Sequence, residues 1–426
     1  MNLLLKLIRH RRPWWLAMAT LWCALAQAQD APGASVDELL KLARERNPEL
    51  ATLQYEADAA KARVQPAGAL PDPRLRTELM DISRGGQQFP TLLPGRVGAA
   101  RYTLMQELPW FGKRDLKREV AELEAQATQT RTTGAWQELA AKIKLTFAQL
   151  YYQAQSEKLT REILDLMARL EAVAQVRYAG GLAAQQDVIR AQLEQTAMRN
   201  ELIGLDAEKR QLLARMNALL GRPSAATLAM PDKLRATPDM TLLDPSALVD
   251  RALARNPTLV AEGTRIQSAE KTRDLTLRNR YPDVTLGLAP NQMQNSWRQW
   301  DVMLELSIPL QQETRRAQER EAEAMLTAAR SRREAVLNQL RADLSENLTA
   351  LDAARRTEAL TTTRLLPQSE LTFQAALAGY ENGKVDFATL LDAQRQIRQA
   401  RLNQLKARAE TQARLAELEK IIGEDL

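Results

Sequence analysis

Cysteine and histidine each occur only once in this chain of 426 residues, as Cys23 and His10. Both lie in an N-terminal segment in which basic residues precede an apolar run from Trp14 to Leu25 and a small-residue site at Ala26-Gln27-Ala28. This pattern is typical of a secretory signal, which we place over residues 1–28. The mature chain is therefore expected to lack both residue types. Disulfides, cysteine nucleophiles, histidine bases and histidine or cysteine metal sites are then excluded.

A long apolar run and a large excess of one charge are also missing. No segment after the signal offers about 20 consecutive apolar residues, so no transmembrane helix is predicted. The formal net charge is +6, and Lys6, Arg9, Arg11 and Arg12 of the signal contribute most of it, so nucleic-acid binding has no support. An exported hydrolase that uses paired carboxylates has no supporting motif either. Aromatic residues make up only 4%, and the abundant Ala, Leu, Gln, Arg and Glu residues favour long helices.

The chain contains one internal repeat, whose two copies carry the same motifs in the same order. Ser35–Leu50 corresponds to Ser246–Leu259, and both segments contain an Asn-Pro pair. The other matches are Leu70-Pro71-Asp72 with Tyr281-Pro282-Asp283, the strand end before Pro109 with that before Pro309, and Arg177–Leu182 with Gly379–Lys384. We predict a first repeat over residues 29–221, a proline-rich connecting segment over 222–245, and a second repeat over 246–426.

Each repeat is predicted to contain a very long helix, a turn and a returning helix. From Lys113 to Tyr178 there is no proline and one glycine, Gly134, so this helix would reach about 100 Å at 1.5 Å per residue. Apolar residues recur in steps of three and four, as in a coiled coil. They are Trp136, Leu139, Ile143, Phe147, Leu150 and Ala154, and after a five-residue shift Leu159, Ile163, Leu166, Leu170 and Val173.

The other helices are delimited by proline and glycine. The second long helix is expected from about Glu313 to Tyr380 with a kink at Pro367. The returning helices are expected near residues 184–219 and 387–422. A shorter helix that begins at Pro48 is expected to end near Val64, because Pro66 and Gly68 follow.

Four segments alternate between apolar and polar residues with a period of two, at about 72–82, 98–108, 282–289 and 299–308. Strands of about 9–11 residues with one apolar face fit a lipid-facing barrel. A half-buried sheet of a soluble protein alternates in the same way. The connections are expected over about 83–95 and 290–296, and the longer one is expected on the outer side.

Four strands cannot close a barrel, and an open edge in lipid leaves backbone groups without partners. A membrane location therefore requires several chains to share one barrel. Two chains would give eight strands with a filled interior, whereas three would give twelve strands and a lumen.

Two copies of helix, two strands, long helix, turn and helix resemble the TolC family of outer-membrane efflux proteins over essentially the whole mature chain. The most specific motifs are the turns, Arg177-Tyr178-x-x-Gly181 followed by Asp187, and Tyr380-x-x-Gly383 followed by Leu391-Asp392. Residues 106–114, Gln-Glu-Leu-Pro-Trp-Phe-Gly-Lys-Arg, are similar to the strand-to-helix junction of the heavy-metal branch, the CzcC-like and CusC-like proteins.

The resemblance implies a mainly α-helical fold with a small β part. It implies a homotrimer with a long α-helical coiled-coil barrel and four strands per chain in a shared twelve-stranded β-barrel. The chain would lie in the outer membrane and mostly in the periplasm, without catalytic residues, cofactor or bound metal. Its partners would be a periplasmic adaptor (membrane fusion) protein, an inner-membrane pump of the RND type and outer-membrane lipid, and no nucleic acid.

The same resemblance makes the protein the exit channel of a tripartite efflux pump, with heavy-metal cations as the first substrate class and organic compounds as the alternative. A periplasmic structural coiled-coil protein would explain the helices but not the four strands. Met80, Met105 and Met303 fall on the polar side of their strands, where thioethers suit a soft metal but also serve as packing.

The turns supply the implied site residues. Gly181 and Gly383 suit left-handed helix ends. The adaptor-contacting tips would comprise these glycines with Tyr178, Leu182, Tyr380, Lys384 and Val385, although both tyrosines suit packing as well. Asp392 matches an acidic residue of the closed entrance, Asp187 is a second candidate, and Thr389 stands where the family has another aspartate. A solvated charge on a helix surface is the alternative interpretation of both aspartates.

Overall fold

The computed structural model describes residues 32–82, 92–94, 97–238, 244–293 and 296–426. The expected signal over residues 1–28 and most of the expected first strand connection lie outside this part. The chain divides into two compact units. The helical unit comprises residues up to Asn47, Leu139–Thr237 and Thr349–Ala416, and the strand unit comprises Pro48–Glu138, Pro238–Leu348 and Glu417–Leu426. Each unit thus takes parts of both sequence repeats.

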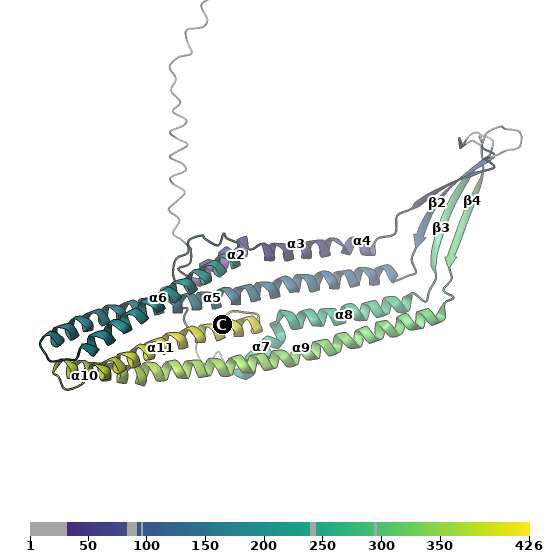
Figure 1. The fold of residues 1–426 in the computed structure, drawn as a ribbon. Helices are drawn as coiled ribbons and strands as arrows, with labels where there is room; N and C mark the ends of the chain where they lie inside the picture. The colour runs from purple at the N-terminus through teal and green to yellow at the C-terminus, as the bar shows by residue number, and fades with distance from the viewer. Residues whose placement is uncertain (1–31, 83–91, 95–96, 239–243, 294–295) are drawn as a thin grey trace, which may run out of the picture. The chain divides into compact units, whose positions relative to one another are not determined.

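The elements follow the predicted order twice (Figure 1). In the first repeat they are α2 (Val36–Arg46), α3 (Pro48–Ala62), α4 (Val64–Gly68), β1 (Arg74–Met80), β2 (Ala99–Leu108), α5 (Lys113–Ala179) and α6 (Gln185–Leu219). In the second they are α7 (Pro245–Arg255), α8 (Pro257–Arg278), β3 (Asp283–Met293), β4 (Ser296–Ser307), α9 (Gln312–Leu360), a π-helical turn (Thr361–Leu365), α10 (Leu366–Glu381) and α11 (Phe387–Ile422). The mainly helical fold with a small β part is confirmed. No described helix is long and apolar enough to cross a lipid bilayer.

The break after α3 differs from the prediction. We expected Pro66 and Gly68 to end a helix at Val64, but the interruption lies at Arg63, and Pro66 lies inside α4. Proline is tolerated there because the first turn of a helix has no hydrogen bond for its missing N–H to make. Gly68 is the last residue of α4.

Each Asn-Pro motif joins the start of one helix to the end of another. The Asn47 side-chain amide donates to the Leu219 carbonyl at 2.9 Å, and that of Asn256 donates to the Ile421 carbonyl at 2.8 Å. The Asn256 side-chain oxygen also accepts from the Leu259 N–H at 2.9 Å, which makes Asn256 the N-cap of α8. The two repeats therefore use the same residue pair to satisfy otherwise unpaired groups at helix ends.

Replacing Asn256 by alanine is expected to lower the free energy of unfolding by about 2–3 kcal/mol. The variant loses the N-cap of α8 and leaves a buried carbonyl at the end of α11 without its donor. Thermal unfolding followed by circular dichroism in detergent would measure the loss. Asn200→Ala, at an exposed position within α6, is the matched control and should change the midpoint little. Equal midpoints for the two variants would contradict the capping role.

The long helix α5 is unbroken, and its buried residues follow the predicted steps over most of its length. Leu139, Ile143, Phe147, Leu150, Leu159, Ile163 and Leu170 are all buried. Beyond Ile163, Met167 and Ala174 are buried in addition to Leu170, whereas the predicted Leu166 and Val173 are not. The prediction failed there because Met167 lies four residues after Ile163 and Ala174 lies four residues after Leu170, whereas steps of three were predicted. Steps of four keep the buried face against the partner helices. The buried face therefore contains a methionine and an alanine where the prediction had placed the branched residues Leu166 and Val173.

Pro367 interrupts the second long helix as predicted, and the interruption takes the form of the π-helical turn before α10. Proline has no N–H to donate to the carbonyl four residues earlier, and its ring displaces that carbonyl, so the regular ladder cannot continue. In the helical unit, residues of α5, α6, α10 and α11 form one apolar core. It contains Leu159, Ile163, Met167, Leu170, Ala191, Met198, Ala376, Tyr380, Phe387, Leu390, Leu391 and Ala393.

The strands form one antiparallel sheet in the order β1-β2-β3-β4. Strands β3 and β4 continue past the predicted ends, so the expected connection over 290–296 is largely paired strand. Pro290 lies opposite Trp300, next to a register shift at Asn291 and Gln292. Within sheets, proline is found at bulges, so Pro290 can lie inside β3. The sequence pattern suggested a turn there because proline is rare inside a strand.

One face of this sheet is apolar and uncovered. Leu75, Leu104, Leu288 and Val302 follow one another across all four strands in register. All four are exposed, and Val302 is 79% exposed. The same face carries Leu286, Trp297, Trp300, Leu304 and Leu306, each also exposed. Among the described residues of the single chain, no other helix or strand covers this face.

The opposite face is polar. Arg101 of β2 pairs with Asp301 of β4 at 3.1 Å and donates to the side-chain oxygen of Asn291 at 3.0 Å. Asn291 in turn donates to Asp301 at 2.7 Å, and Glu78 of β1 lies 4.0 Å from Arg101. Charged and amide groups from every strand are therefore connected on this face.

Candidate functional site

The candidate site consists of the two turns that end the long helices, both in the helical unit. We call residues 177–187 the first tip and residues 379–389 the second tip. Gly181 and Gly383 have φ of 71° and 70°, a left-handed conformation that glycine adopts without strain. The Leu182 N–H donates to the Arg177 carbonyl at 2.8 Å, and the Lys384 N–H donates to the Gly379 carbonyl at 2.8 Å. The tips therefore share one kind of helix C-terminus, the Schellman motif.

Arg177 of the first tip holds the second tip. Its guanidinium donates to the carbonyls of Tyr380 and Glu381 at 2.8 and 2.9 Å, and lies 4.9 Å from the centre of the Tyr380 ring. Arg177 is part of the first turn motif in the sequence, but the motif predicted no role for it. Its long side chain at a helix end was the available signal, because cations there interact with terminal carbonyls.

Tyr380 is a packing residue. Its side chain is 2% exposed, between the Arg177 guanidinium and the Phe387 ring, whose centre lies 5.3 Å away. The expectation that Tyr380 lies on an adaptor-contacting surface is therefore wrong for this conformation. Its hydroxyl has no hydrogen-bond partner among the residues that the structure describes, so the ring supplies the contact.

The other tip residues differ in exposure. Leu182 is 72% exposed, and Tyr178 and Lys384 are also exposed, as an adaptor-contacting surface requires. Val385 was expected on that surface, but it is half-buried against Gly379. The contact arises because the left-handed turn folds the chain back over the last turn of α10, where glycine leaves room.

The carboxylates of the tips have different environments. Asp187, in the first turn of α6, has a pKa raised above its ordinary value by burial and then by the nearby charge of Asp386. Asp386 precedes α11 and accepts from the Thr389 hydroxyl at 2.5 Å and the Thr389 N–H at 2.9 Å, which lowers its pKa. The hydroxyl of Thr389, predicted at the entrance, is thus used in a helix cap. Sequence reasoning missed Asp386, although an aspartate three residues before a threonine at a helix start is a capping pattern.

Asp392 lies apart from this cap on the surface of α11. Its carboxylate is 3.7 Å from Arg395, which also pairs with Glu194 of α6. The structure therefore gives Asp392 an exposed ion pair. It brings Asp187, Asp386 and Thr389 together at the base of the tips, with Asp392 on the next turn.

Stability should depend on pH with opposite signs at Asp187 and Asp386. Asp187 binds its proton more tightly in the folded state, so the folded state loses stability as pH rises from about 3.8 through the raised pKa. Asp386 binds its proton more weakly when folded and loses its contribution as pH falls from about 3.8 through the lowered pKa. At neutral pH, Asp187→Asn should unfold at a higher temperature than the parent protein and Asp386→Asn at a lower one. Melting curves from pH 3 to 8 test this, and shifts of equal sign would contradict it.

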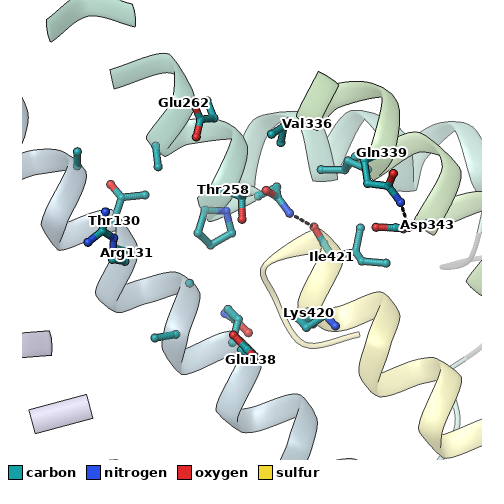
Figure 2. A pocket seen from close by; sticks show the side chains of 18 of the residues that line it. Thr130, Arg131, Glu138, Thr258, Glu262, Val336, Gln339, Asp343, Lys420 and Ile421 are labelled. Carbon is teal, nitrogen blue, oxygen red and sulfur yellow. Dashed lines mark hydrogen bonds between the residues drawn. The ribbon is translucent and has the colours of Figure 1, made fainter. Parts of the chain in front are cut away.

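A cavity of about 590 Å³ lies in the strand unit between α5, α8, α9 and the end of α11 (Figure 2). Asn256 and its hydrogen bond to Ile421 form part of the lining, as do Gln339 and Asp343, which are joined at 2.7 Å. No group of three or more His, Cys, Asp or Glu side chains within the described residues is arranged to hold a metal ion.

Met80, Met105 and Met303, the methionines predicted on the polar side of their strands, do not form one site. Register places Met105, Gly287 and Met303 in one row across the sheet, whereas Met80 pairs with Ala99 at the other end of β1. The Met303 methyl group lies over Gly287, where an added Cβ would meet it at 3.0 Å. Met303 therefore fills the space that glycine leaves, which favours the packing interpretation.

The sequence matches the outer membrane efflux protein family over residues 39–222 and 248–424. It is 25% identical over 429 residues to the cobalt-zinc-cadmium resistance protein CzcC of Cupriavidus metallidurans, with 96% of this chain and 98% of that protein covered.

Solved structures share the fold. The outer-membrane channel OprN is 21% identical with a TM-score of 0.79, over 91% of this chain and 89% of that one. CusC is 16% identical with a TM-score of 0.78 (94% and 96% covered), and VceC of Vibrio cholerae is 17% identical with a TM-score of 0.78 (92% and 96%). The predicted resemblance is confirmed over both repeats, and the chain belongs to the outer membrane efflux protein family, whose members are channels and not enzymes.

Proposed function

We propose that this outer-membrane efflux channel exports heavy-metal cations. The observation that carries the proposal is the end-to-end match to a cobalt-zinc-cadmium resistance protein. The strand-to-helix junction over residues 106–114 points to the same branch. A wide duct needs no metal-binding site of its own, because an attached pump can select the substrate. Export of organic compounds by the same architecture is the second candidate.

The proposal includes a trimeric assembly in the outer membrane. Strands β1 and β4 are the edges of the sheet, and its apolar face is uncovered in the single chain. Three copies that join β4 of one to β1 of the next would satisfy the edges and give twelve strands with a lumen. The uncovered face suits lipid, which argues against the half-buried soluble sheet and the periplasmic coiled-coil protein. The native mass of the detergent-extracted protein tests this assembly, and a soluble monomer would overturn it.

The helices and tips would lie in the periplasm in this assembly. The exposed residues Tyr178, Leu182 and Lys384 would contact a periplasmic adaptor protein, which connects the channel to an inner-membrane pump of the RND type. Export would be driven by that pump, so the channel needs no cofactor or covalent step. Asp187 and Asp392 would contribute charge at the periplasmic entrance.

Deleting the genes of this channel and its pump together is expected to lower the tolerated concentrations of one or more of copper, silver, zinc, cobalt and cadmium. Growth inhibition by each metal measures the effect, and the wild-type channel and pump returned on a plasmid should restore tolerance. Dyes and detergents tested on the same strain distinguish the second candidate. Unchanged tolerance to all five metals, together with new sensitivity to organic compounds, would replace the metal assignment.

A further inference from the structure

Among the described residues, the two most exposed large apolar side chains lie outside the sheet, where strands lead into the long helices. Phe111, between β2 and α5, is 85% exposed, and Leu310, between β4 and α9, is 81% exposed. Both follow the proline that comes after a strand, so they occupy corresponding places in the two repeats. We call residues 109–112 and 308–311 the junction loops. Single exposed apolar residues are ordinary on protein surfaces, so their surroundings decide what they mean.

The second junction loop continues the apolar face of the sheet. Apolar residues occupy alternate positions along β4, which places them on one side of the strand. The same spacing extends past the end of β4, and every residue in the series is exposed: Val302, Leu304, Leu306, Ile308 and Leu310. The chain begins to turn only here, where the Leu310 N–H donates to the Ile308 carbonyl at 3.1 Å. The apolar surface therefore does not stop at the last strand pair.

Aromatic residues lie at both ends of this surface. At the end away from the helices, Tyr102 and Trp297 have ring centres 5.7 Å apart, and Trp300 is exposed on the same face. At the helix end, Trp110 of the first junction loop stacks on Tyr281 with ring centres 5.2 Å apart. Tryptophan and tyrosine collect where the apolar layer of a membrane meets its polar layers, because their rings are amphipathic. The second boundary of the apolar surface therefore lies at the junction loops.

The length of the surface supports the same boundary. From Trp300 to Leu306 the six residue steps cover about 20 Å along the strand, or about 15 Å in height at a tilt of about 40°. The apolar band of outer-membrane barrels is about 25 Å tall, so this stretch is too short. From Trp300 to Leu310 the same arithmetic gives about 33 Å along the chain and about 25 Å in height. The junction loops thus supply the missing part of the band.

We propose that the junction loops lie within the periplasmic leaflet of the membrane, with Phe111 and Leu310 in contact with phospholipid acyl chains. The sequence becomes polar directly after each loop, with Lys113-Arg114-Asp115 at the start of α5 and Gln312-Glu313 at the start of α9. The boundary between lipid and water therefore falls at the first turn of these helices. The inference rests on the proposed outer-membrane location and extends it, because it assigns lipid contact to residues outside the sheet.

Single-cysteine labelling of the full mature chain in phosphatidylcholine vesicles tests the inference. Cys23 lies in the expected signal, so no other thiol competes for a fluorescent label. Labels at Phe111→Cys and Leu310→Cys should be quenched by brominated acyl chains and protected from iodide in the water. Glu122→Cys is the matched control, because this exposed residue of α5 lies about 14 Å beyond the start of the helix. Its label should show the reverse pattern, with quenching by iodide and none by lipid.

A label at Val302→Cys, on the apolar face of the sheet, separates this inference from the proposed location. Quenching of the Val302→Cys label by lipid, with both loop labels open to iodide, would place the sheet in the membrane and overturn the inference alone. If iodide also reached the label at Val302→Cys, the proposed location would fail as well. Protection of the loop labels from both quenchers would assign Phe111 and Leu310 to a contact with a second copy of the chain and would likewise overturn the inference.

Discussion

Replacing Lys113 by alanine is expected to lower the free energy of unfolding of the strand unit by about 2–3 kcal/mol. The Lys113 side chain is 5% exposed, and its ammonium group pairs with Asp283 at 2.8 Å and donates to the Tyr281 carbonyl at 3.0 Å. Loss of one partner from a buried ion pair costs about 3–5 kcal/mol, because the other charge stays behind. Asp283 is 34% exposed, so water replaces part of the interaction and reduces the loss.

The change should also loosen the junction between strand and helix. The Trp110 N–H donates to Asp283 at 2.8 Å, and the Trp110 ring stacks on Tyr281 with centres 5.2 Å apart. Lys113→Met, which restores the bulk without the charge, should recover only a part of the stability. Chemical denaturation in detergent, with tryptophan fluorescence as the signal, measures both effects. Lys158→Ala, which removes an exposed lysine of α5, is the control, and a loss no larger than in this control would refute the role of Lys113.

Replacing Arg177 by alanine is expected to release the second tip from the first, with a loss of about 2 kcal/mol. Two hydrogen bonds from a charged donor and one cation–π contact disappear together. Because the Tyr380 and Glu381 carbonyls can reach water after the change, the loss stays below the sum of the separate contacts. Amide hydrogen exchange over residues 380–386 should become faster, whereas exchange in the middle of α5 should not.

Two further variants separate the parts of this contact. Arg177→Lys keeps the charge but not the planar fork, so intermediate exchange rates are expected. Tyr380→Phe removes only a buried hydroxyl that has no partner in the described part of the chain, and it should leave stability unchanged or slightly higher. If amide exchange over residues 380–386 were fast in Tyr380→Phe and slow in Arg177→Ala, the Tyr380 hydroxyl and not Arg177 would hold the second tip.

Local patterns in the sequence were sufficient to predict the strands and the long helices of this fold. The period-two segments predicted all four strands, and the absence of proline between Lys113 and Tyr178 predicted α5. Details within elements depended on packing. The buried face of α5 passes through Met167 and Ala174, which no rule of residue type favours over Leu166 and Val173. Pro290 suggested a turn, but a bulge accommodates it within β3.

The site was predictable only in part. The glycines of the tips follow from the turn motifs, because left-handed helix ends require them. The contacts that organise the site join residues far apart in the chain. Arg177 and Tyr380 are 203 residues apart, and Lys113 and Asp283 are 170 apart. No local pattern connects such residues, so the burial of Tyr380 appeared only in the structure. The cap at Asp386 joins residues three apart, and it is a local pattern that the prediction missed.

The order of strands in the sheet constrains when the apolar face can be completed. Strand β2 pairs with β3, so Leu108 cannot pair until Val284 has been synthesised. The chain between these two residues contains the first helical hairpin and the connecting segment. Before β3 and β4 arrive, β1 and β2 form at most an isolated hairpin, which is marginal in water. Pairing over such sequence distances is slow compared with helix formation. A chain cut short after its first repeat would therefore never present the complete apolar face, which in the proposed assembly makes insertion of the sheet into the membrane depend on delivery of the whole polypeptide.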